Sequence, residues 1–160
     1  MDDVRSEIGV KPAFKVSGRI NKPVHEVYEA VANPDHLNQF FTTGPDAKGR
    51  LETGATVTWD FADFPGAFPV KVVEVEQDKR IVLQWGASDR SGPAYDTTVT
   101  MDFEALEDGR TLVTIRESGW RETEAGLKAA FGNCEGWTGM LCAMKVWLEH
   151  GLNIRKGFYK

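Results

Sequence analysis

The chain has 160 residues, of which 41% are hydrophobic and 27% are charged, a composition typical of one soluble globular domain. Its formal net charge is −5 and it has no run of lysines and arginines, which argues against nucleic acid and an anionic membrane surface as partners, because both require a basic face. The N-terminal sequence MDDVRSEIGVK lacks the apolar core of a signal peptide, so we expect a cytoplasmic protein.

Residues 1–12 are polar and aperiodic, so we expect a loose tail before a single domain at 13–160. The domain should open with a strand, because apolar and polar residues alternate over 14–20. Two short helices are predicted next, at 23–31 and at 33–40. Each has a proline near its start, where the missing N–H costs nothing and the fixed φ suits a helix.

A meander of antiparallel strands is predicted between 50 and 118, because the apolar residues there repeat every second position and the connections are short. The expected strands lie near 57–61, 70–75, 81–85, 95–105 and 112–117, and longer loops are expected at 64–66 and 88–93. The same alternation assigns four aspartates to outward faces or loops as solvated charges: Asp60, Asp63, Asp96 and Asp102.

The most apolar stretch lies near the C-terminus, at 133–151, and is predicted to be a helix. Its apolar residues fall within an arc of roughly 120° at about 100° per residue: Trp137, Met140, Leu141, Met144, Trp147 and Leu148. An arc of this width fits a helix packed on a sheet. The segment is not a membrane span, because a span needs about 20 predominantly apolar residues and this one carries charges on its other face.

Motifs of common active sites are absent from the sequence, which has no GxSxG, HExxH, P-loop or GxGxxG. The three histidines lie on separate segments, and neither Cys134 nor Cys142 has a candidate base nearby in sequence. A helix would hold the Cα atoms of the two cysteines about 12 Å apart, too far for a disulfide. We therefore expect no metal, no cofactor and no disulfide.

Five segments occur in the order found in the SRPBCC superfamily: NKPVHEVYEAVANPDHLNQFF, LETGATVTWDF, VVEVEQDKRIVLQW, TIRESGW and GWTGMLCAMKVWLEHG. Within it they resemble bacterial homologues of the activator of the ninety-kilodalton heat-shock-protein ATPase. The resemblance implies an α+β helix-grip fold, START-like or birch-pollen-allergen-like. In that fold a curved antiparallel sheet of about six or seven strands surrounds a long C-terminal helix, with two short helices after the first strand.

The resemblance also implies a cavity between the C-terminal helix and the sheet, for a lipid-like or polyketide-like molecule. Glu117 matches the polar residue of the family's TESG pattern, and alternation puts it on one face with Val113 and Ile115. The expected cavity wall on the helix is Trp137, Leu141, Met144 and Leu148. The expected wall on the sheet is Trp59, Trp85, Tyr95, Val99, Met101, Val113 and Ile115, with Glu117 as the polar contact.

Several alternatives stay open. Glu117 could instead be a structural carboxylate bonded to Arg116, Arg121 or the backbone. As a function, we expect binding of a hydrophobic small molecule rather than catalysis. The alternatives are a chaperone partner in a stress response and a cyclase- or hydrolase-type enzyme with Glu117 as general base. The eukaryotic co-chaperone has a separate N-terminal domain that nothing here resembles, so its activity is not carried over. Ligand identity and oligomeric state are not predicted.

Overall fold

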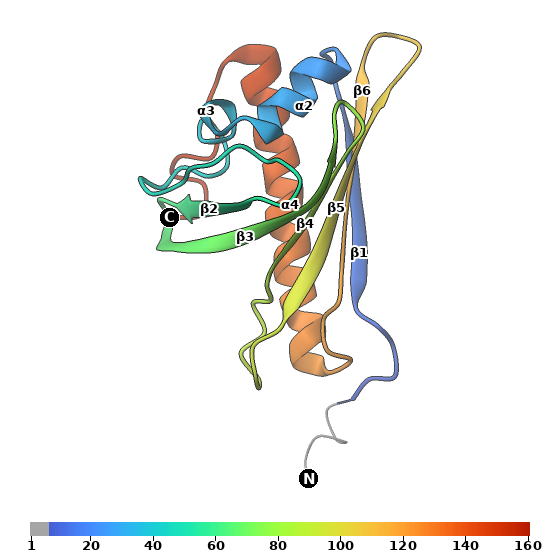
Figure 1. Cartoon of the computed structure of the whole chain (residues 1–160), viewed down its shortest axis with the longest axis vertical. Coiled ribbons are helices and arrows are strands. Elements are labelled where there is room, and N and C mark those ends of the chain that lie inside the picture. Colours follow the sequence, from blue (N-terminus) through green and yellow to red (C-terminus); the bar gives the residue numbers. More distant parts are fainter. Residues whose placement is uncertain (1–6) are drawn as a thin grey trace.

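The computed structural model describes residues 7–160, which form one antiparallel sheet packed against a long C-terminal helix (Figure 1). In chain order the elements are β1 (Ala13–Ile20), α2 (Val24–Ala32), α3 (Pro34–Leu37), β2 (Thr56–Phe61), β3 (Phe64–Glu76), β4 (Arg80–Gly86), β5 (Asp96–Ala105), β6 (Thr111–Ser118) and α4 (Glu124–His150). The predicted α+β helix-grip class is confirmed, with six strands in the described part of the chain.

The sheet has the strand order β1-β6-β5-β4-β3-β2, and every neighbouring pair is antiparallel. The last five strands are joined in sequence as a meander, and β1 pairs with β6, with Phe14 opposite Glu117. Figure 1 shows the sheet curving along α4, with α2 and α3 near the C-terminal end of that helix. The N-terminal half of α4 therefore meets the sheet away from the two short helices.

The core lies between α4 and the sheet and follows the predicted periodicities. On the helix, Trp137, Met140, Leu141 and Met144 are buried, whereas Cys142 on the opposite face is exposed. The face predicted for α4 is thus confirmed, although Trp147 and Leu148, near its C-terminal end, are only half-buried. The strands contribute alternate residues, and β5 and β6 bury Val99, Met101, Phe103, Val113 and Ile115.

The predicted loop at 64–66 is wrong, because these residues form the first part of β3. Ala62 and Asp63 make a tight turn that pairs Phe64 with Phe61 at once. The strand β4 pairs with β3 only from Lys71 onward, so Pro65 can lie in the strand without removing a donor from that ladder.

The outward assignment of Asp60 is also wrong, since this residue is only 3% exposed. The register between β2 and β3 shifts between Trp59 and Phe61, which breaks the alternation at this position. The buried carboxylate accepts hydrogen bonds from the backbone N–H groups of Asp46, at 3.1 Å, and Gly66, at 3.3 Å. Gly44 packs so closely that a Cβ there would lie 2.3 Å from Cγ of Asp60.

The second short helix is shorter than expected, because α3 ends at Leu37 and the chain continues in turns. The side chain of Asn33 accepts from the N–H of Asp35 and so caps this helix. Of the expected loose tail, residues 1–6 lie outside the described residues. Glu7 forms an isolated bridge with Thr123, so the tail is anchored from that point.

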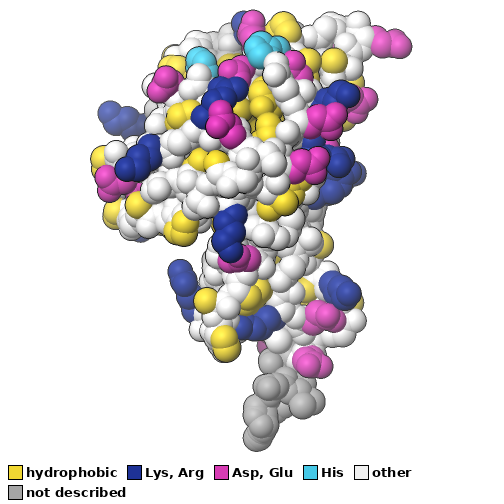
Figure 2. Space-filling view, viewed as in Figure 1, with side chains coloured by type: hydrophobic (Ala, Val, Ile, Leu, Met, Phe, Trp, Pro, Cys, Tyr) yellow, Lys and Arg dark blue, Asp and Glu magenta, His cyan; other side chains and the backbone are white. Residues whose placement is uncertain are grey.

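Two surface properties bear on partners. Figure 2 shows basic and acidic side chains interspersed over the visible face, so this face has no continuous basic surface among its described residues. No helix within residues 7–160 combines the length and apolar character needed to cross a membrane.

Candidate functional site

The site is centred on Glu117, a carboxylate on β6 that is only 1% exposed. Its Oε2 accepts from the indole N–H of Trp85 at 2.8 Å and from the hydroxyl of Thr97 at 2.6 Å. Its Oε1 accepts from the indole N–H of Trp137 at 2.9 Å. The amide nitrogen of Asn133 lies 3.0 Å from both oxygens. Four uncharged side chains therefore supply the hydrogen bonds of this buried carboxylate.

These donors come together because of the strand register and the helical repeat. Trp85 on β4 lies directly opposite Thr97 on β5, and Glu117 follows on the next strand, β6, opposite Val99. Asn133 and Trp137 are four residues apart in α4, which places both on one face of the helix. The carboxylate thus links three strands to α4.

One alternative from the sequence was that Glu117 bonds to Arg116 or Arg121. This alternative is wrong, because both arginines bond to other carboxylates. Arg116 points away from the core and pairs with Asp102 at 3.1 Å. Arg121 pairs with Asp89 at 3.3 Å. The alternation of β6 explains the first case, since neighbouring strand residues face opposite sides of the sheet.

An aromatic cluster surrounds the carboxylate on its inner side. The ring of Trp85 lies 5.5 Å from those of Trp59 and Trp137 and 5.8 Å from that of Phe68, measured between centroids. Phe41 stacks on Trp137 at 5.3 Å. Such spacings are typical of favourable aromatic pairs. The space between the helix and these strands is consequently filled by rings.

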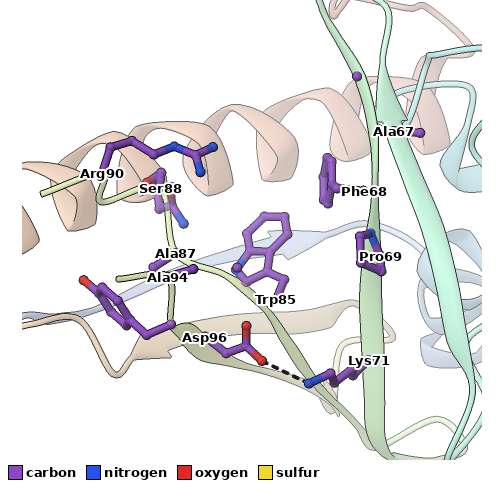
Figure 3. Close-up of a pocket in the computed structure, with 14 residues that line it drawn as sticks. Ala67, Phe68, Pro69, Lys71, Trp85, Ala87, Ser88, Arg90, Ala94 and Asp96 are labelled. Atoms are coloured by element: carbon purple, nitrogen blue, oxygen red, sulfur yellow. Dashed lines mark hydrogen bonds and ion pairs between the residues drawn. The ribbon is translucent and has the colours of Figure 1, made fainter. Parts of the chain in front are cut away.

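A pocket of about 830 Å³ opens at the edge of this cluster, between β3, the end of β4, the loop at 87–95 and α4. Figure 3 shows the Trp85 side chain in the pocket wall, between Phe68 on the β3 side and Arg90 on the loop side. Asn133 lines the pocket from α4. Trp85 and Asn133 thus each touch both the pocket and Glu117.

The rim carries few charges. Lys71 pairs with Asp96 at 3.2 Å, and both side chains are well exposed. Ser88 donates to the amide oxygen of Asn133 at 3.4 Å. The rest of the lining is largely apolar and includes alanines, glycines and Pro69. The pocket therefore suits a mostly apolar molecule.

Asp89 anchors the loop that forms one side of the pocket. This carboxylate accepts from the Tyr95 hydroxyl at 2.7 Å, the Ser91 N–H at 2.9 Å and Arg121 at 3.3 Å. Burial raises the pKa of Asp89, but these hydrogen bonds and the Arg121 charge outweigh it and hold the pKa at about 2. The Arg121 guanidinium also lies 4.2 Å from the centre of the Tyr95 ring.

The residues expected to form the cavity divide into three groups. Trp85 and Tyr95 line the pocket. Leu148 is half-buried. The remaining nine are buried within the packed core: Trp59, Val99, Met101, Val113, Ile115, Glu117, Trp137, Leu141 and Met144.

Phe68 and Asn133 line the pocket and were not singled out from the sequence. Asn133 could have been found from its spacing, because it lies one helical turn before Trp137 on the same face. Phe68 had no such signal, since its strand was expected to begin two residues later. Within residues 7–160, no group of three or more His, Cys, Asp or Glu side chains is arranged to hold a metal ion. Both cysteines are free.

The curved six-stranded antiparallel sheet packed around a long C-terminal helix defines a helix-grip protein. Residues 21–149 match the family described as "Activator of Hsp90 ATPase homolog 1-like protein", and the chain belongs to this family.

Individual relatives agree with this assignment. The Hsp90 co-chaperone AHA1 of Saccharomyces cerevisiae is 29% identical over 121 residues, which cover 71% of this chain but only 30% of the yeast protein. The protein SSP2350 from Staphylococcus saprophyticus superposes with a TM-score of 0.74 at 29% identity, over 89% of this chain and 96% of that one. DynU16, a protein in the dynemicin biosynthetic locus, gives a TM-score of 0.71 at 26% identity, over 89% and 49%.

Proposed function

We propose that this protein binds a hydrophobic small molecule, lipid-like or polyketide-like, in the pocket beside Trp85. The observation that carries the proposal is the position of this indole, whose N–H is fixed by Glu117 at 2.8 Å while its ring lines the pocket. An aromatic ring held in one orientation presents a preformed apolar surface, so a ligand need not pay to order it.

The size and lining of the pocket support the proposal. A volume of about 830 Å³ lies within the range of about 300–1,000 Å³ that small-molecule sites usually have. Phe68 and Trp85 approach it from two neighbouring strands, so a flat apolar molecule could contact both rings. Burial of about 200 Å² of apolar ligand surface would contribute on the order of 5 kcal/mol before the costs of association.

The relatives offer limited support of the same kind. DynU16 is a protein of a biosynthetic locus, a setting in which a protein that holds a small organic molecule would act. The similarity covers half of that protein, so its own role is only a guide for this chain.

A thermal-shift screen against hydrophobic compounds tests the proposal, followed by titration of the best compound into two variants. Phe68→Ala removes a pocket ring, whereas Phe131→Ala removes a 64% exposed ring from a separate apolar groove formed by the outer face of α4 and the C-terminal residues. We expect Phe68→Ala to weaken binding by about tenfold. Phe131→Ala should leave it unchanged. Weaker binding in Phe131→Ala with unchanged binding in Phe68→Ala would show that the ligand binds in the outer groove.

A second candidate function is regulation of an Hsp90-type chaperone in a stress response. The yeast co-chaperone is similar over most of this chain, but the chain spans less than a third of it, so the activity of the whole yeast protein is a separate proposal here. Addition of this protein to the chaperone of the same organism should then raise its ATP turnover in a saturable way. If turnover does not change, only the binding function remains.

A further inference from the structure

We propose that Glu117 is a positioning residue that holds Trp85 and Asn133 at the wall of the pocket, and that it neither contacts the ligand nor transfers protons. The inference rests on the proposed function, because it assigns a role within the same pocket. It excludes the general-base role that the sequence left open for this carboxylate.

The first argument is that the hydrogen-bonding capacity of Glu117 is already used. A carboxylate offers about four lone-pair positions. Oε2 lies within hydrogen-bonding distance of Trp85, Thr97 and Asn133, and Oε1 within that distance of Trp137 and Asn133. These five contacts leave no lone pair directed at a substrate. A general base needs a free position within reach of the proton that it removes.

The second argument is that Glu117 does not reach the pocket. Its side chain is buried and is not among the residues that line the pocket, whereas its partners Trp85 and Asn133 are. The indole and the amide therefore lie between the carboxylate and any ligand. Glu117 can influence binding only through them.

The third argument concerns the chemical type of the donors. An indole has one N–H and no acceptor, so Trp85 and Trp137 can bond only to an acceptor. They approach different oxygens of Glu117, so both oxygens must accept. Glutamine has the same shape but replaces one oxygen by an NH₂ group, which would face an indole donor. Glu117→Gln should therefore break one side of the network.

The network also explains why such a residue is needed. Glu117 on β6 bonds to β4 through Trp85, to β5 through Thr97 and to α4 through Asn133. Trp85 from β4 and Asn133 from α4 both line the pocket, so the spacing of these two walls depends on how α4 is held against β4. A buried acid that joins both sides sets this spacing more specifically than apolar packing does.

The ¹H–¹⁵N spectrum of the indole N–H groups, assigned with Trp→Phe substitutions, tests the inference. In Glu117→Gln we expect the resonance of Trp85 to move, with or without that of Trp137, while those of Trp59, Trp120 and Trp147 stay in place. Thr97→Val removes one donor to Oε2, the oxygen shared with Trp85, so it should move Trp85 more than Trp137. This variant decides the matter if Glu117→Gln does not fold.

Binding of the best compound from the thermal-shift screen is measured on the same samples. We expect Glu117→Gln to lower its affinity by about tenfold, together with the indole shifts. An unmoved Trp85 resonance would overturn the inference. If binding is lost while that resonance stays in place, the pattern indicates that Glu117 contacts the ligand directly. If no compound binds the wild-type protein, the proposed function fails, whereas the indole shifts still decide whether Glu117 positions Trp85.

Discussion

Arg155 donates from Nε and Nη2 to the two carboxylate oxygens of Asp63, at 3.1 and 2.8 Å, although the residues are 92 positions apart in sequence. The side chains are only 9% and 10% exposed. The guanidinium also lies 5.1 Å from the centre of the Phe61 ring. This pair therefore ties the residues after α4 to the turn between β2 and β3. It also corrects the expectation that Asp63 is a solvated charge.

Arg155→Ala should destabilise the protein by about 3 kcal/mol, because it leaves the largely buried carboxylate of Asp63 without its partner. Lys156→Ala is the matched control, since the neighbouring lysine is exposed and its loss should cost less than about 0.5 kcal/mol. Urea unfolding at neutral pH measures both values. Equal urea midpoints for the two variants would mean that the ion pair does not anchor the residues after α4.

Met144→Ala should cost about 2–5 kcal/mol in the free energy of unfolding, because this side chain is fully buried between α4 and the sheet. Cys142→Ala, two residues earlier on the exposed face, should be nearly neutral. Chemical denaturation of the two variants checks the assignment of the helix faces. A larger loss for Cys142→Ala would show that the faces are reversed.

The stability contribution of Asp89 should depend on pH in a defined window. The folded-state pKa of about 2 lies below the ordinary value of 3.8, so the contribution is fully present above about pH 4 and is lost as the pH falls toward 2. Its size should be about 2 kcal/mol. The difference in unfolding free energy between wild type and Asp89→Asn should accordingly be larger at pH 6 than at pH 2.5. A difference that does not change with pH would argue against the ionised anchor.

Much of the fold could be predicted because it depends on periodicity. The alternation in β5 and β6 and the arc on α4 arise from burial of one face, and both are readable from the sequence. The start of β3 could not be predicted, because it contains Pro65 and Gly66, and both residue types are also common in loops. The inward turn of Asp60 results from a register shift that no local pattern indicates.

The site was predictable in part. Alternation was enough to turn Glu117 inward, but its partners depend on which side chains three strands and a helix bring together. Trp137 and Asn133 reach it only because α4 crosses the sheet at that point. The bulk of Trp59 and Trp137 fills the space that was expected to be open. The pocket therefore lies at the edge of the helix–sheet interface, and this depends on packing rather than on pattern.

The central claim is that an apolar ligand sits against Trp85 and Phe68. Intermolecular NOEs between the best compound from the thermal-shift screen and the protein test it most directly, because they identify the protons that touch the ligand. We predict NOEs from the compound to the rings of Phe68 and Trp85, and none to Phe131 or Phe158, which lie on the separate outer groove. NOEs to Phe131 and Phe158, with none to Trp85, would contradict the claim.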